Sequence, residues 1–224
     1  RGVKTTLVVG RKVPRWPECH SPAWGNDEKL LTYLETVVNR YKGNSSVVAW
    51  QVENEPFLDF GICPEPDAKF LDRELELVRS LDNRSIILTD SGELGGWARS
   101  AKRADIFGTT MYGVVWRDQK PKFYVRYPSM PSLFWFKANL AGVTTGIDKI
   151  IVSELQAEPW GPGMIYEISF EEQRKSMNLK QFRKNLKLAR DTGFSEVYFW
   201  GVEWWYKEKL AGRPDIWEEA KKVL

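Results

Sequence analysis

The stretch VVAWQVENEP, residues 47–56, decides the fold class. It opens with an almost unbroken apolar run, the pattern of a strand that is covered by helices, and it ends in polar residues. Similar apolar runs occur at residues 86–88 and 150–152. A loop and an amphipathic stretch follow each run, so we expect alternating β and α units in a parallel sheet or barrel.

Working outward from this stretch, the alternation occurs six times. The predicted strands are residues 6–10, 47–53, 85–89, 106–112, 149–154 and 196–201. The predicted helices are residues 27–42, 67–81, 95–102, 131–140, 171–192 and 214–224. A closed eight-stranded barrel usually takes about 250 residues. The 224 residues of this chain therefore predict one domain, residues 1–224, with an α/β fold of the (β/α)8 TIM-barrel type that lacks two units.

Composition excludes several classes of protein. The chain is 42% hydrophobic and 28% charged, which is typical of a globular domain, and it has no apolar run of 18 residues, so we expect no membrane span. The net charge of +3 is spread out, and the densest basic cluster, residues 180–190, has the spacing of a solvent-facing helix side. Nucleic acid is therefore not an expected partner. No leader is visible at Arg1, and both a cytoplasmic and a secreted location stay open.

Metal and thiol chemistry are not expected. Cys19 and Cys63 lie far apart without a CxxC motif, so free thiols are the simplest interpretation and a disulfide between them is the alternative. The single histidine, His20, cannot build a zinc site and has no nucleophile motif beside it. We expect no cofactor, and His20 is a candidate for substrate contact.

Two glutamates stand where predicted strands end, the position at which a barrel places its active site. Glu55 follows the strand at 47–53, and Glu154 ends the strand at 149–154. Retaining glycoside hydrolysis needs one carboxylic acid to protonate the leaving oxygen and one carboxylate to attack, held about 5 to 5.5 Å apart. The sequence thus predicts a glycosidase with Glu55 and Glu154 as its catalytic pair.

The segment Asn54-Glu55-Pro56, together with the Ser-Glu strand end at Glu154, resembles the clan A glycoside hydrolases, especially the cellulase-like family five. The resemblance implies a retaining (β/α)8 barrel with Glu55 as acid/base and Glu154 as nucleophile. It also implies that Asn54 hydrogen-bonds the sugar 2-hydroxyl, that Tyr112 donates to the nucleophile, and that Trp200 floors the −1 subsite.

Residues 51–55 also look like the acid/base segment of family thirty-five β-galactosidases, so the resemblance implies a β-linked glycoside of open identity. The six units would match strands three to eight of the family barrel, with strands one and two absent. The alternative is a truncated barrel with weak or no hydrolysis, which binds carbohydrate or forms a homo-oligomer through its open edge.

Several further residues have two interpretations. Glu158 rivals Glu154 as nucleophile, and Glu53 is predicted to be structural. Trp50 and Trp135 are predicted to pack in the core. Aromatic planes also stack on sugar rings, and the tryptophans at or near strand ends are predicted to serve as sugar platforms: Trp16, Trp116, Trp160, Trp200, Trp204 and Trp205.

Overall fold

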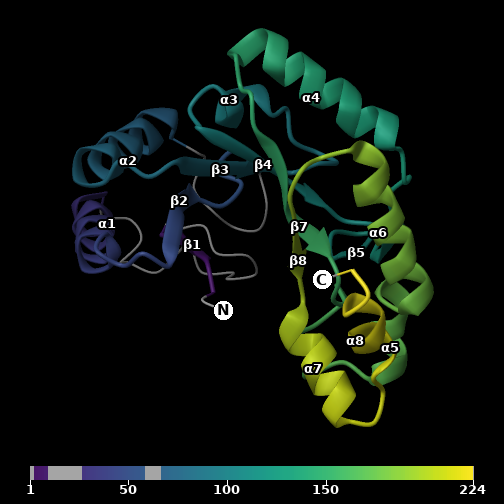
Figure 1. Ribbon diagram of the computed structural model, residues 1–224. Helices are drawn as coiled ribbons and strands as arrows, with labels where there is room; N and C mark the ends of the chain where they lie inside the picture. The colour runs from purple at the N-terminus through teal and green to yellow at the C-terminus, as the bar shows by residue number, and fades with distance from the viewer. Residues whose placement is uncertain (1–2, 10–26, 59–66, 224) are drawn as a thin grey trace. The chain divides into compact units, whose positions relative to one another are not determined.

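A computed structural model describes residues 3–9, 27–58 and 67–223 of the chain (Figure 1). The chain divides into two compact units, Arg1–Gly108 with Ala138–Ile150, and Thr109–Lys137 with Ile151–Leu224. The candidate residues Trp16 and His20, and both cysteines, lie outside the described residues.

Six strands form a parallel sheet, and helices alternate with them along the chain. In the order in which they neighbour one another, the strands are β1 (Thr5–Val8), β2 (Val47–Glu53), β3 (Ile86–Asp90), β4 (Ile106–Met111), β7 (Ile150–Gln156) and β8 (Val197–Trp200). The predicted fold class, an incomplete (β/α) barrel of six units, is confirmed. All six strands are present close to the predicted bounds. The central strands β2, β3, β4 and β7 are largely buried, as in a parallel sheet covered by helices, whereas β1 and β8, at the two ends of the strand order, are half-buried or exposed.

The first unit is built around β2, whose side chains are buried at six of its seven positions. Trp50 is fully buried between Leu7 of β1 and Ile86 of β3, as predicted. Helices α1 (Asp27–Tyr41) and α2 (Ala68–Leu81) lie side by side next to these strands (Figure 1). Their apolar faces complete a cluster that includes Leu34 and Val78.

An ion pair fastens α2 to the strands of the first unit. Asp105 accepts two hydrogen bonds from the Arg79 guanidinium, at 2.9 and 3.0 Å, and one from the Ile86 N–H at 2.8 Å. Burial opposes ionisation of Asp105, but these hydrogen bonds and the Arg79 charge outweigh it and hold the Asp105 pKa below its ordinary value. Asp105 thereby anchors the segment that enters β4.

The second unit has a core of its own behind β7 and β8. This unit contains the helices α5 (Phe170–Ser176), α6 (Leu179–Thr192), α7 (Val202–Leu210) and α8 (Asp215–Ala220). Phe182, Trp205 and Ile216 are buried together in one apolar cluster. Asn178 caps the start of α6 by accepting from the Gln181 N–H, which separates it from α5. The single helix predicted over 171–192 is therefore two helices, α5 and α6.

The predicted platform role of Trp204 and Trp205 is wrong. Both side chains are buried, and the Trp205 indole N–H donates to the Ala157 carbonyl at 2.7 Å. The physical reason is helix α7, which begins directly after β8 and was not predicted. Its turn directs both indoles into the core of the second unit.

A hairpin of β5 (Val114–Arg117) and β6 (Phe123–Arg126) fills the segment between β4 and α4, where no strand was predicted. The Trp116 and Tyr124 rings meet edge to face, 5.1 Å between centroids. The Tyr124 hydroxyl donates to Glu172 of α5 at 2.7 Å, and burial together with this bond raises the Tyr124 pKa above its ordinary value. The hairpin is thus fastened to α5.

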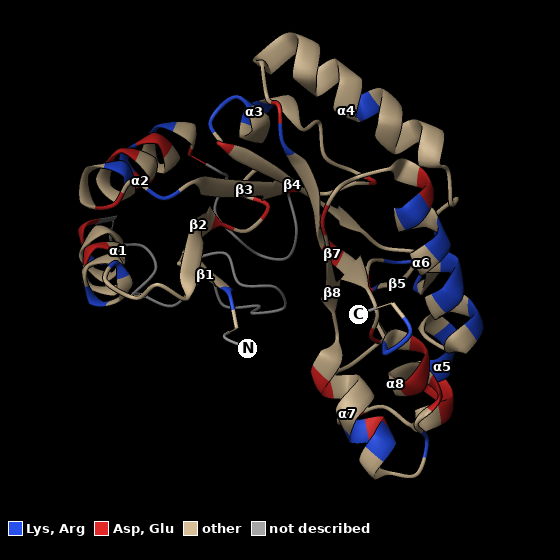
Figure 2. Ribbon diagram, in the orientation of Figure 1, with Lys and Arg blue, Asp and Glu red and all other residues tan. Residues whose placement is uncertain are grey.

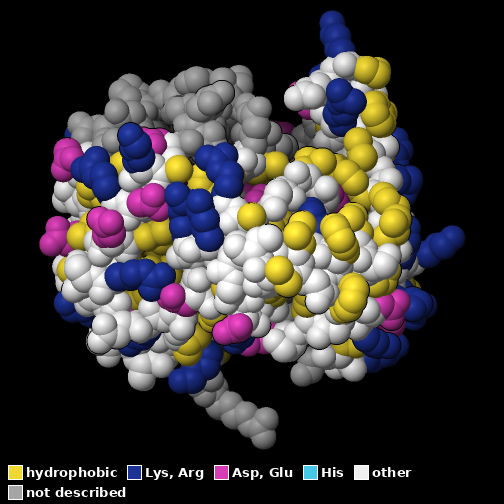
Figure 3. Space-filling view, turned by 90° about the horizontal axis from the view of Figure 1, so that it is seen from above, with side chains coloured by type: hydrophobic (Ala, Val, Ile, Leu, Met, Phe, Trp, Pro, Cys, Tyr) yellow, Lys and Arg dark blue, Asp and Glu magenta, His cyan; other side chains and the backbone are white. Residues whose placement is uncertain are grey.

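The prediction that Trp135 is buried is wrong. Helix α4 (Pro131–Thr145) is apolar on all sides, and Phe134 occupies the inward position, so that Trp135 is left 61% exposed. Figure 3 looks down on the side of the molecule where α4 lies in Figure 1, and hydrophobic side chains reach the surface there. The exposed hydrophobic residues of α4 are Leu133, Trp135, Phe136, Leu140 and Val143.

Charged residues concentrate on helix surfaces, and α6 carries the densest blue colouring in Figure 2. Arg183 of α6 forms an ion pair with Glu219 of α8, 2.8 Å between Nε and Oε1, so part of the positive charge of α6 is paired with a carboxylate of the same unit. Among the described residues, no helix is long and apolar enough to cross a membrane. No group of three or more His, Cys, Asp or Glu side chains suited to a metal ion occurs in that part of the chain either.

Gly201 joins β8 to α7 in a conformation that only glycine adopts readily, with φ +133°. A Cβ at this position would lie 2.6 Å from the Glu158 Cβ and 2.9 Å from backbone atoms. We expect Gly201→Ala to lower the free energy of unfolding by about 2 to 4 kcal/mol, measured by urea denaturation. The control is Gly43→Ala, where a Cβ meets nothing within 4 Å. Equal stabilities for the two variants would contradict the described turn.

Candidate active site

In the first unit, the chain turns sharply where β2 ends. Glu55 adopts a left-handed conformation, φ +46°, which is uncommon for a residue with a side chain. Its N–H donates to the Thr89 hydroxyl at 2.7 Å, and its carbonyl accepts from the Leu58 N–H at 3.0 Å. The half-buried Glu55 is therefore held by its backbone at the ends of β2 and β3.

The neighbouring Asn54 is buried, with a fixed amide. Its Oδ1 accepts from Gln51 Nε2 and from the Thr89 hydroxyl, both at 3.0 Å. Because two donors meet the oxygen, the amide orientation follows from the hydrogen-bond network, and Nδ2 points away from them. Within residues 3–9, 27–58 and 67–223, no acceptor is recorded for Asn54 Nδ2. This leaves an oriented donor beside Glu55. Glu53, predicted to be structural, is buried in the sheet.

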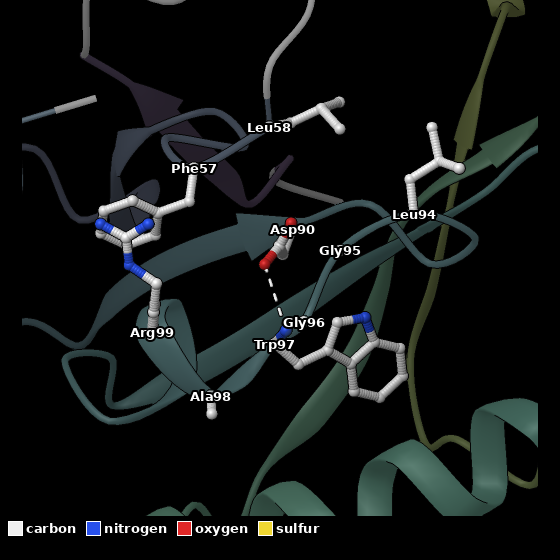
Figure 4. A pocket seen from close by; sticks show the side chains of 9 residues that line it. All are labelled: Phe57, Leu58, Asp90, Leu94, Gly95, Gly96, Trp97, Ala98 and Arg99. Atoms are coloured by element: carbon white, nitrogen blue, oxygen red, sulfur yellow. Dashed lines mark hydrogen bonds between the residues drawn. The ribbon is translucent and has the colours of Figure 1, made fainter. Parts of the chain in front are cut away.

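A pocket of about 450 Å³ opens beside this turn in the first unit (Figure 4). Phe57, Leu94 and Trp97 supply apolar walls, and the Arg99 guanidinium lies over the Phe57 ring, 3.9 Å from its centroid. The buried Asp90 accepts from the Trp97 N–H at 3.2 Å, drawn as a dashed line. The pocket combines an apolar lining with one cation and one carboxylate.

In the second unit, Glu154 lies near the end of β7 and is only 7% exposed. The Tyr112 hydroxyl, from the residue after β4, donates to Glu154 Oε2 at 2.7 Å. A hydrogen bond of this kind favours the ionised carboxylate. The structure therefore brings together two of the predicted site residues, Tyr112 and Glu154.

Trp160 contacts Tyr112. Its indole meets the Tyr112 ring edge to face, with centroids 5.3 Å apart. The backbone N–H of Trp160 donates to the Ser176 hydroxyl at 3.0 Å, and the backbone carbonyl of Trp160 accepts from the backbone N–H of Trp116 at 3.1 Å. Trp160 is thus attached to α5 and to the hairpin, and its half-buried ring stands beside Tyr112.

Glu158, the rival carboxylate, has a different environment. Its Oε1 accepts from the Trp200 indole N–H at 3.0 Å. Trp200 is 37% exposed at the end of β8 and keeps part of its ring available for contact. The structure therefore pairs Glu158 with Trp200 and Glu154 with Tyr112, in two separate arrangements.

Three polar residues near the site were not predicted from the sequence: Thr89 near the end of β3, Gln156 at the end of β7, and Asn185 on α6. Thr89 binds both the Glu55 N–H and the Asn54 amide, and the buried Gln156 and Asn185 form a network behind Tyr112. Thr89 ends its predicted strand, which is the same signal that singled out Glu55. Gln156 and Asn185 carry no comparable signal, because their contacts depend on segments far apart in the chain.

No family model matches the chain, and no curated protein matches it. The resemblance to the cellulase-like family five therefore stays a prediction. Among solved structures, the chain is similar to a GH2 β-galacturonidase from Eisenbergiella tayi bound to galacturonate, at 14% identity and TM-score 0.53, over 81% of this chain and 30% of that one. This likeness shows the fold.

Two further neighbours are a β-glucuronidase from Faecalibacterium prausnitzii and a thermostable mutant of a xylanase from Cellvibrio japonicus. The first has 17% identity and TM-score 0.49, over 78% of this chain and 28% of that one. The second has 14% identity and TM-score 0.47, over 85% and 63%. The chain thus spans about three tenths of the length of the glucuronidase and the galacturonidase.

Proposed function

We propose that this chain is a retaining glycoside hydrolase that acts on β-linked glycosides, with Glu154 as nucleophile and Glu55 as acid/base. The observation that carries the proposal is the Tyr112 hydroxyl on the Glu154 carboxylate, 2.7 Å away at the end of β7. The nucleophile of this mechanism is an ionised carboxylate, and the ionised form is the one that accepts a strong, charge-assisted hydrogen bond.

The reaction takes two steps. In the first, Glu154 attacks the anomeric carbon, the glycosidic C–O bond breaks, and Glu55 gives its proton to the leaving oxygen. In the second, Glu55 removes a proton from water, the water oxygen attacks the anomeric carbon, and the bond to Glu154 breaks. The mechanism requires the two carboxyl groups to lie about 5 to 5.5 Å apart.

Other residues are assigned to substrate binding. The oriented Asn54 Nδ2 donates to the sugar 2-hydroxyl, and Trp200 and Trp160 present aromatic faces to sugar rings. We also propose that Trp16 and His20 bind substrate, on the basis of their positions in the sequence. The pocket beside Glu55 receives the leaving group, because the acid must reach the oxygen that departs.

Glu154 is preferred to Glu158 as nucleophile because of its donor. The Tyr112 hydroxyl donates to Oε2 of Glu154, and β7 carries Glu154 within the strand. Glu158 instead lies beyond β7 and accepts from the Trp200 indole. Because Glu158 binds the Trp200 indole, we assign Glu158 to orienting that ring, which contacts the sugar.

The test is hydrolysis of a panel of aryl β-glycosides. The panel contains glucosides, galactosides and xylosides, and also glucuronides and galacturonides, since structural neighbours carry those names. We expect at least one to be hydrolysed, with the first product in the β-anomeric form by NMR. A chain that binds the sugars without cleaving any of them is the carbohydrate-binding alternative. That result, or release of the α-anomer first, would reject the proposal.

A further inference from the structure

Gln156 lies two residues after Glu154 on β7 and is completely buried. Its side-chain amide binds the backbone of the turn that follows β4. The Gly113 and Val114 N–H groups donate to Gln156 Oε1, at 2.9 and 3.0 Å, and Gln156 Nε2 donates to the Val114 carbonyl at 2.6 Å. One amide thus binds three backbone groups of this turn.

These bonds connect the two partners of the site. Tyr112 directly precedes Gly113, so the clamped backbone begins one residue after the tyrosine. Glu154 is carried by the same strand as Gln156. A rotation of the turn would move the Tyr112 hydroxyl away from Glu154, and the Gln156 amide opposes that rotation.

Gln156 and the turn are themselves supported by α6. The Gln156 carbonyl accepts from Asn185 Nδ2 at 2.8 Å, and Asn185 Oδ1 accepts from Gln181 Nε2 at 2.8 Å. A Cβ on Gly113 would lie 2.5 Å from Gln181 Nε2, so the turn closes directly on these amides. Buried networks of this kind are rigid when every member is satisfied.

We infer that Gln156 is a positioning residue, which holds the Tyr112 hydroxyl on the Glu154 carboxylate by binding the backbone of Gly113 and Val114. An effect of Gln156 on catalysis rests on the proposed function, whereas an effect of Gln156 on the Tyr112–Glu154 hydrogen bond does not. The two claims therefore need separate measurements.

The first measurement is a double-mutant cycle in thermal stability, which requires no activity. Tyr112→Phe removes a hydrogen bond to a carboxylate and is expected to lower the Tm by about 3 to 10 °C. In the Gln156→Met background, the same Tyr112→Phe change is expected to lower the Tm by less than about a third as much, because the bond is already weakened. Equal losses in both backgrounds would overturn the inference.

The control is Gln173→Met. Gln173 is also a buried glutamine, whose Nε2 donates to the Ile165 and Ile168 carbonyls and whose Oε1 accepts from the Trp204 indole. None of these bonds involves Tyr112 or Glu154. In the Gln173→Met background, Tyr112→Phe should therefore lower the Tm by as much as it does in wild type. A reduced loss here as well would show that the coupling is general destabilisation, and would overturn the inference.

If Gln156→Met does not fold, Gln156→Glu takes its place in the cycle. A protonated carboxyl keeps an acceptor for the two N–H groups and a donor for the Val114 carbonyl, whereas the ionised form loses the donor. At pH 5 the Tyr112→Phe loss should therefore approach its wild-type size, and at pH 8 it should shrink. A loss that is independent of pH and equal to that in wild type would overturn the inference.

The second measurement repeats the cycle with kcat on a substrate from the panel. Tyr112→Phe is expected to lower kcat about 100-fold in wild type and less than about 3-fold in Gln156→Met. Equal factors would overturn the catalytic part of the inference. If wild type hydrolyses nothing while the Tm cycle is non-additive, the proposed function fails and the positioning role of Gln156 stands.

Discussion

Replacing Glu154 by glutamine is expected to lower kcat on the order of 10,000-fold or more, on every substrate that the wild-type chain hydrolyses. The amide has nearly the shape of the carboxylate and still accepts the Tyr112 hydrogen bond, but it cannot attack the anomeric carbon. Folding should therefore be retained, as checked by circular dichroism and Tm. Steady-state kinetics with an aryl β-glycoside gives the loss in kcat.

The matched control for this variant is Glu158→Gln. Both glutamates lie near the end of β7, and each accepts a hydrogen bond from an aromatic side chain, from Tyr112 and from Trp200 respectively. We expect the Glu158 variant to keep kcat within about 10-fold, since weakening one platform contact costs on the order of 1 kcal/mol. The reverse order of losses would make Glu158 the nucleophile.

Glu55→Ala is expected to have an effect that depends on the leaving group. For a methyl β-glycoside, which needs protonation, kcat/KM should fall about 100- to 10,000-fold. For a dinitrophenyl β-glycoside, which departs without a proton, the loss in the first step should be less than about 10-fold. The ratio of the two losses separates an acid from a residue that only binds substrate, and it is measured on one protein preparation.

The control for this variant is Glu76→Ala on the exposed face of α2, which should leave both substrates unaffected. Glu55 has an unusual backbone conformation, so a fold defect in Glu55→Ala must be separated from a chemical one. A fold defect lowers the rates with both substrates by the same factor. Equal factors in a stably folded variant would remove Glu55 from the acid/base role.

The six strands were predictable because each is a short β-rich run that is followed by a loop and an amphipathic stretch, whereas the hairpin and α7 were not. Strands β5 and β6 are four residues long and only partly buried, and although each has an apolar run of three residues, at 114–116 and 123–125, no amphipathic stretch separates them. Helix α7 begins immediately after β8, and its Trp204 and Trp205 looked like strand-end aromatics. In both cases tertiary packing decides a structure that local sequence does not signal.

The candidate site divides in the same way. Carboxylates at strand ends are visible in the sequence, and that signal, together with the resemblance of the Asn54-Glu55-Pro56 segment, selected Glu55 and Glu154 as candidates. The bonds that orient them are not visible, because Thr89 lies 34 residues from Glu55 and Gln156 lies 42 from Val114. Only the fold brings these partners together. The left-handed turn at Glu55 likewise depends on its bond to Thr89.

The most direct test of the account is to identify the residue that becomes covalently bound to the sugar. A 2-deoxy-2-fluoro aryl β-glycoside of the hydrolysed sugar slows the second step, so the glycosyl-enzyme accumulates and can be digested and sequenced by mass spectrometry. The account predicts one added sugar, on Glu154, and no addition in Glu154→Gln. A sugar found on Glu158, or hydrolysis of the panel with no covalent adduct at any glutamate, would contradict it.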